Sequence, residues 1–234
     1  MRAATMLCLL LLAFTGVACG SDEKSGEENN LIPGESAQEP EAAPAPKPKA
    51  GACQEVQPPS SRPDGGEKKP SAQLDSGKTY EVEVNTNCGS FTIALDQKAS
   101  PAAAASFVTL AKKGFFDGTI FHRIVPGFVI QGGDPTGTGT GGPGYSTVDK
   151  PPADVAYTKG VVAMAKTGEE APGTSGSQFY VVTGADAGLP PEYALLGKVT
   201  KGLDVTQKIG KLGDPATEMP TQTVAIETAT VKER

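Results

Sequence analysis

Residues 121–134 read FHRIVPGFVIQGGD, and the fold can be worked out from this stretch. It carries most of two short apolar runs, Ile120–Val125 and Phe128–Gln131, which have the length of β-strands. Three further runs of this kind follow, at Val161–Ala165, Phe179–Thr183 and Leu195–Val199. The sequence therefore predicts a fold made of many short strands.

The sequence before this stretch predicts a hairpin and then a helix. Tyr80–Val84 and Phe91–Leu95 alternate apolar and polar residues, and turn residues lie between them. Ser100 and Pro101 have the residue types that favour the N-cap and the first position of a helix. Apolar residues at helical spacing continue this helix until Gly114.

The end of the chain completes a mostly β architecture. A second short helix is expected at Leu203–Leu212, and a last alternating strand at Thr223–Val231. Many short strands with two helices predict a closed eight-stranded antiparallel barrel, capped by the two short helices. Closure would also remove sheet edges that could template aggregation.

The first residues have the pattern of an export signal. Arg2 precedes an apolar core at Met6–Phe14, and small residues follow before Cys19. We therefore expect residues 1–18 to be a signal peptide. The apolar core is shorter than the roughly 20 residues that a membrane-spanning helix needs.

Cys19 is a candidate lipid-attachment site. Small residues that end in a cysteine resemble the bacterial lipobox, although Gly16 stands where that pattern usually has leucine. Acylation of Cys19 would anchor an exported protein to the outer side of the cell membrane. An ordinary cleavage after Ala18 is the alternative, and it would leave a secreted protein.

Residues 19–74 are expected to form a disordered linker before a domain at 75–234. The linker is rich in Pro, Glu and Ala, and it lacks the apolar residues needed to offset the entropy of ordering. Its prolines favour an extended spacer, although such a tract can also be a ligand for partner domains. Residues 20–50 hold seven acids and three lysines, which supply −4 of the net charge of −6. The domain thus lacks the basic excess that a nucleic-acid partner requires.

Two cysteines remain in the mature chain if Cys8 leaves with the signal peptide and Cys19 is acylated. They are Cys53 and Cys88. An even pair in an exported protein indicates a disulfide, which would tie the linker to the first hairpin. Two separate thiols are the alternative.

The stretch at 121–134 resembles the signature of the cyclophilin family of peptidyl-prolyl cis/trans isomerases. The likeness continues, in family order, through Gly139–Gly142, Met164–Lys166, Gly176–Tyr180 and Leu195–Val199. It covers about residues 77–232. The resemblance implies a cyclophilin-like barrel that accelerates rotation about X–Pro bonds in exported or envelope proteins.

The resemblance also implies the roles of individual residues. Arg123 would donate to the amide nitrogen, Gln131 would bond the substrate backbone, and Gln178 would orient Arg123. The implied substrate-binding residues are Phe128, Val129, Ala165, Lys166, Tyr180 and Leu189. Rotation breaks no bond, so neither a nucleophile, a metal nor a cofactor is expected, and the partners are proline-containing polypeptides bound by a monomer.

Some residues depart from the family pattern or belong to other patterns. Gly188 and Tyr193 stand where many members have tryptophan and histidine, which keeps a non-catalytic proline-peptide-binding or chaperone-like module as the alternative. A structural envelope lipoprotein is a further possibility. His122 is interpreted as structural, because strand alternation directs it away from Arg123. The glycines at 137–142 fit a dinucleotide-binding spacing, but no helical pattern follows them.

Overall fold

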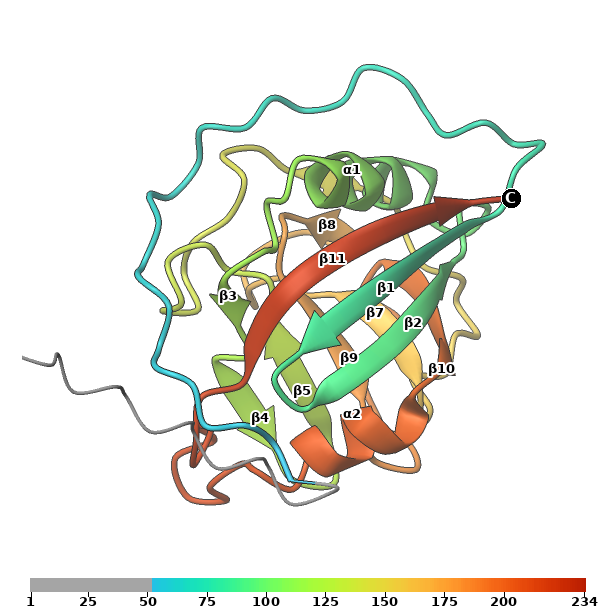
Figure 1. The fold of residues 1–234 in the computed structure, drawn as a ribbon. Coiled ribbons are helices and arrows are strands. Elements are labelled where there is room, and N and C mark those ends of the chain that lie inside the picture. The colour runs from blue at the N-terminus through green and yellow to red at the C-terminus, as the bar shows by residue number, and fades with distance from the viewer. Residues whose placement is uncertain (1–51) are drawn as a thin grey trace, which may run out of the picture. The chain divides into compact units, whose positions relative to one another are not determined.

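The computed structural model describes residues 52–234, and the following sections concern this part of the chain (Figure 1). The expected signal peptide, Cys19 and the first part of the expected linker lie outside the described residues.

The described chain is mostly β-sheet with two helices, as expected. The helices are α1 (Pro101–Lys112) and α2 (Leu203–Ile209). The strands are β1 (Tyr80–Thr86), β2 (Gly89–Leu95), β3 (Thr119–Ile120), β4 (Arg123–Val125), β5 (Val129–Gly132), β6 (Thr147–Val148), β7 (Val161–Met164), β8 (Thr174–Ser175), β9 (Phe179–Val182), β10 (Leu195–Lys201) and β11 (Ala225–Glu233).

The main sheet corrects the prediction of a closed eight-stranded barrel. It has nine strands in the order β3-β11-β1-β2-β10-β7-β9-β5-β4, while β6 and β8 form a separate pair. The sheet curls into a half-barrel, and β3 and β4 are its edge strands (Figure 1). Only Phe121 and His122 separate these two strands along the chain. The chain itself therefore joins these two edges. An isolated bridge pairs Ile120 of β3 with Asp134, just after β5, but within residues 52–234 it is not extended into a ladder.

Aromatic rings fill the core inside the curled sheet. Phe107 of α1 meets Phe179 of β9 edge to face, with 5.3 Å between ring centroids, and Phe121 and Phe116 pack on the same ring. All four side chains are buried. Edge-to-face pairs of this kind add to the burial of apolar area, so the core fixes how α1 sits on the sheet.

The start of α1 is capped differently from the prediction. Ser100 occupies the N-cap position, but its side chain makes no capping hydrogen bond. Asp149, from the segment after β6, accepts a hydrogen bond from Ala103 N at 2.6 Å instead. A carboxylate suits the positive end of a helix, so a residue distant in sequence satisfies the exposed N–H group.

Residues 52–74 lie along the surface of the domain, and we call them the strap. They contain no helix or strand, yet Arg62 N donates to Pro135 O at 2.9 Å and Gly65 N donates to Gly142 O at 3.0 Å. Glu67 pairs with Lys113 at the end of α1 at 2.5 Å. Figure 1 shows the strap passing outside β3 and then over α1. This part of the expected linker is therefore in contact with the domain, because backbone groups offset its lack of apolar residues.

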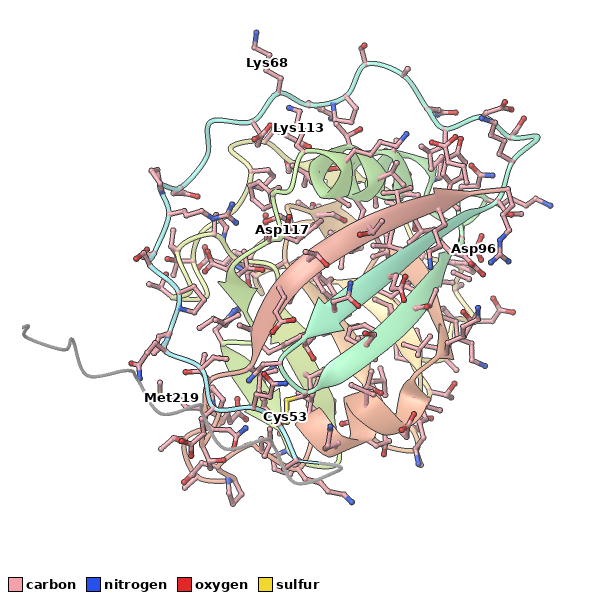
Figure 2. The ribbon with its side chains drawn as sticks, in the orientation of Figure 1. Cys53, Lys68, Asp96, Lys113, Asp117 and Met219 are labelled. Carbon is pink, nitrogen blue, oxygen red and sulfur yellow. A yellow bond between two sulfur atoms is a disulfide. The ribbon has the colours of Figure 1, made fainter. Side chains whose placement is uncertain are left out.

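A disulfide between Cys53 and Cys88 fixes the start of the strap to the turn between β1 and β2 (Figure 2). The buried side chain of Asn87 reinforces this junction. Its Nδ2 donates to Gln54 O at 2.7 Å and to Thr223 O at 3.0 Å, and its Oδ1 accepts from Ala225 N at 3.0 Å. One amide thus connects the strap, the hairpin and β11.

Candidate active site

Strand register brings the central polar residues of the candidate site into one row. Arg123 of β4 is paired with Gln131 of β5, and Gln131 is paired with Tyr180 of β9. Residues directly opposite one another in neighbouring strands project to the same face. The alternate residues Ile124 and Ile130 are buried in the core, so the row must face outward.

A groove with a volume of about 200 Å³ lies over this row, and we call it the apolar groove. Its lining consists of Arg123, Phe128, Val129, Gln131, Ala165, Lys166, Tyr180, Leu189 and Tyr193. The structure thus brings together every site residue implied by the resemblance except Gln178, and it adds Tyr193. The cationic side chains of Arg123 and Lys166 stand beside an apolar and aromatic wall, which is the composition of a site for an apolar ring next to a polar bond.

Arg123 is held by an ion pair that leaves its tip at the groove. Its Nε donates to Glu218 Oε2 at 2.7 Å, and its Nη1 donates to Gln131 Oε1 at 3.3 Å. The Arg123 side chain is 36 % exposed, and pairs of this exposure contribute only about 0–1 kcal/mol to stability. The pair therefore matters more for the direction of the guanidinium than for folding.

Gln178 reaches Arg123 only through Gln131. Gln131 Nε2 donates to Gln178 Oε1 at 3.0 Å. Gln178 Nε2 in turn donates to the carbonyls of Gly139 and Gly141, each at 2.9 Å. The two glutamines thus form a chain of hydrogen bonds that connects the loop at 139–141 to the guanidinium.

A second hollow, with a volume of about 410 Å³, adjoins the apolar groove. Gln131, Ala165 and Lys166 line both, so the two form one continuous surface. Asp64 of the strap also lines the second hollow, and its Oδ1 accepts from Gly142 N at 2.7 Å. The strap therefore supplies part of the wall.

Buried Asp134 organises the loop that holds Gln178. Its two carboxylate oxygens accept from Thr136 N at 2.7 Å, Gly139 N at 2.6 Å and Gly141 N at 3.2 Å, and also from the Thr136 hydroxyl. A Cβ at Gly141 would overlap Asp134 Oδ1, so the loop needs glycine there. Burial pushes the Asp134 pKa upward, but these hydrogen bonds together outweigh it and hold the pKa below its ordinary value.

Asp134→Asn is expected to destabilise the protein at pH 7 by about 1–3 kcal/mol, because an amide nitrogen would face N–H donors. The pKa of Asp134 in the folded protein lies below its ordinary value of 3.8. The carboxylate therefore stabilises the folded state above pH 3.8 and loses this effect as the pH falls through the folded-state pKa. Urea unfolding of both proteins at pH 7 and pH 3 should therefore give a smaller difference in acid. Glu227→Gln, which removes an exposed carboxylate, is the control. Equal differences at both pH values would show that the charge is not responsible.

Three tyrosines form the aromatic end of the apolar groove. Tyr193 packs edge to face against Tyr180 at 5.6 Å and against Tyr157 at 5.9 Å between ring centroids. The Tyr157 hydroxyl donates to Tyr193 O at 2.6 Å and accepts from Tyr193 N at 3.0 Å. Burial, with the neighbouring Tyr157 and Tyr193, raises the pKa of Tyr180, so its hydroxyl stays neutral. Tyr157 therefore fixes the rim residue Tyr193 from behind.

Lys166 borders the groove without presenting an unpaired charge to it. Its Nζ pairs with Glu192 Oε2 at 3.1 Å and lies 5.5 Å from the centre of the Tyr193 ring. The same nitrogen donates to Thr167 O and Glu170 O. The ammonium is thus engaged, and Arg123 is the cation whose donors are directed to the groove.

His122 is not part of the groove lining. It lies under the glycine loop, where an added Cβ at Gly139 would contact its ring, and burial lowers its pKa.

Within residues 52–234, no group of three or more His, Cys, Asp or Glu side chains is placed to hold a metal. Over the same residues, no helix has the length and hydrophobicity to span a bilayer.

Sequence reasoning missed Glu218 and Tyr157. Glu218 is 95 residues from Arg123 in a polar loop, so no local pattern connects the two. Its φ of 59° is the one left-handed value at a non-glycine residue among residues 52–234, and such a conformation costs about 1–2 kcal/mol. Tyr157 stands alone before β7, without a periodic signal.

Known proteins are similar to this chain in sequence and in fold. A sequence model described as "Cyclophilin type peptidyl-prolyl cis-trans isomerase/CLD" matches residues 81–231. The chain is 35 % identical to peptidyl-prolyl cis-trans isomerase CYP18-2 of Arabidopsis thaliana over 154 residues, which are 64 % of this chain and 92 % of that protein. It is 36 % identical to peptidyl-prolyl cis-trans isomerase A of Mycobacterium tuberculosis over 171 residues, covering 65 % and 92 % of the two chains.

Solved structures give the same result. A cyclophilin-type isomerase of Cryptosporidium parvum, crystallised in the presence of the dipeptide Ala-Pro, is 30 % identical and has a TM-score of 0.59. The match covers 65 % of this chain and 98 % of that one. The agreement of sequence, curled sheet and relatives leads to one conclusion: the chain belongs to the cyclophilin-type peptidyl-prolyl cis-trans isomerases.

Proposed function

We propose that the apolar groove binds a proline ring while Arg123 stabilises the twisted X–Pro amide, so that the isomerase acts without a covalent intermediate. The observation that carries this proposal is the position of the Arg123 guanidinium at the edge of the groove formed by Phe128, Val129, Leu189 and the tyrosines. The partners are proline-containing segments of exported or envelope proteins. The Ala-Pro dipeptide named with the Cryptosporidium relative supports this class of ligand.

The chemistry of the amide explains why a guanidinium is suitable. Rotation about the peptide bond faces a barrier of about 18–20 kcal/mol, because resonance delocalises the nitrogen lone pair. In the twisted transition state the lone pair returns to a pyramidal nitrogen, which then accepts a hydrogen bond. Arg123 donates to this nitrogen and gains little from the planar ground state, so it lowers the barrier selectively.

The other groove residues hold the chain on either side of the rotating bond. Phe128, Val129 and Leu189 contact the pyrrolidine ring, while Gln131 bonds the substrate backbone. Ala165 and the backbone of Lys166 bind the residue before proline. Gln178 supports Gln131 through their 3.0 Å hydrogen bond. Fixing one side of the bond lets the other turn as a unit.

Exchange of a proline tetrapeptide between cis and trans tests the proposal. The rate is measured by two-dimensional NMR with catalytic amounts of the purified protein, and acceleration over the uncatalysed rate is expected. The alternative is a non-catalytic proline-peptide-binding or chaperone-like module, in which Tyr193 at the groove supports binding without turnover. Saturable peptide binding with no acceleration would select that alternative.

The proposal includes export and an anchor. Residues 1–18 direct export, and Cys19 is acylated, which places the isomerase on the outer side of the cell membrane as a monomer. The disulfide between Cys53 and Cys88 supports an oxidising compartment. Mass spectrometry of the mature N-terminus should find Cys19 with its acyl chains. An unmodified N-terminal Cys19 would contradict the anchor and indicate a secreted protein.

A further inference from the structure

Glu218 accepts hydrogen bonds from two consecutive residues of β4. Its side-chain Oε2 accepts from Arg123 Nε at 2.7 Å, and its backbone carbonyl accepts from Ile124 N at 2.8 Å. Ile124 is fully buried in the core. Although the Glu218 side chain is 45 % exposed, its carboxylate is therefore held relative to the strand that carries Arg123.

The loop between α2 and β11 holds Glu218 in an unfavourable backbone conformation. Its φ is 59°, which a side chain with a Cβ rarely adopts. The Asp214 carboxylate accepts from Ala216 N and Thr217 N, while its backbone exchanges hydrogen bonds with Glu218 and Met219. Strain of this kind persists only where the surroundings impose it, and it is concentrated at functional sites.

The guanidinium is thereby held from two sides. Glu218 accepts a hydrogen bond from Nε on one side. Gln131, which is itself hydrogen-bonded to Gln178, accepts one from Nη1 on the other. Arginine presents its five donors in a fixed planar fork, so fixing two of them sets the direction of the rest. The remaining terminal N–H groups are then directed by the protein, at the edge of the apolar groove.

We propose that Glu218 is a positioning residue that pre-orients Arg123 for the amide nitrogen, an inference that rests on the proposed function of Arg123. Glu218 does not line the apolar groove, so it acts through the arginine. Loss of the carboxylate lets the guanidinium change rotamer, which misdirects the donor in the transition state. The apolar wall is unchanged, so the effect falls on kcat and not on KM.

The test uses the full chain and variants that separate the carboxylate from the backbone. Glu218→Gly removes the side chain and accepts the positive φ without strain. We expect kcat to fall about tenfold with KM unchanged, while the Tm stays level or rises. Glu218→Gln keeps an oxygen that can accept from Nε and should restore most of the activity. Glu227→Gln, an exposed carboxylate on β11, should match the wild type.

Two further measurements make the test decisive. In the Arg123→Ala background, Glu218→Gly should have no additional effect, because the two residues act as one unit. Nitrogen-15 NMR of the Arg123 Nε–H group should show greater mobility in Glu218→Gly than in the wild type. An unchanged kcat, a raised KM or an additive loss in the double variant would overturn the proposal, as would an Nε–H group that is equally rigid in both proteins. Absence of catalysis by the wild type would refute the proposed function instead, and the NMR comparison would still decide the role of Glu218.

Discussion

Arg123→Ala is expected to lower kcat/KM for a proline tetrapeptide by about 100- to 1,000-fold, the usual cost of removing one donor aimed at charge that develops in a transition state. The loss should appear in kcat, because the nitrogen accepts a hydrogen bond only when the amide is twisted. Peptide affinity should change little, since Phe128, Val129 and Leu189 still line the groove.

Arg123→Lys provides the matched comparison for this prediction. Lysine keeps the charge but lacks the planar fork, so it cannot donate to Glu218 and to the substrate in the geometry of arginine. It should recover only a small part of the lost rate. Circular dichroism and peptide titration establish that each variant folds and binds. Wild-type turnover by either variant would show that the guanidinium does not take part in the reaction.

Loss of the disulfide between Cys53 and Cys88 is expected to lower the free energy of unfolding by about 3–4 kcal/mol, for cysteines 35 residues apart. The bond restricts the unfolded chain, and a longer enclosed segment gives a larger effect. Urea unfolding of Cys53→Ala/Cys88→Ala against the oxidised wild type gives the difference.

The reduced wild type is the control for this second prediction, because it keeps both sulfur atoms in place. It should resemble the double alanine variant, with an additional difference for the buried Cys88 side chain. The m-value should rise in both, since an unfolded chain without the cross-link exposes more surface. A difference below about 1 kcal/mol would mean that contacts within the strap restrict the unfolded chain as strongly as the bond does.

The parts of the fold that could be predicted from sequence depend on local patterns. Alternation located the first hairpin to within two residues at the ends of β1 and β2, and helical spacing located α1. The same alternation predicts that Arg123 and Ile124 project to opposite faces of their strand. In the structure Arg123 lines the groove and Ile124 lies in the core. Local periodicity carries this information, because a strand or a short helix sets the direction of each side chain by itself.

The remaining features depend on contacts between distant segments. Asp149 caps α1 from 46 residues away from Ala103, and Glu218 meets Arg123 across 95 residues. The strap lacks an apolar pattern and is held through backbone hydrogen bonds, which residue type does not reveal. The number of strands and the edges of the sheet likewise depend on which backbones meet, so the predicted closed barrel was wrong in this respect.

The Cys53–Cys88 bond determines how the domain bears mechanical load. It is a covalent shortcut, so a force applied to the chain before Cys53 would enter the domain at the turn between β1 and β2. These strands lie inside the sheet, between β11 and β10, where several ladders share the force. The strap lies between the two cysteines in sequence, so it would carry little of such a force, and Asp64 would keep its place beside the second hollow.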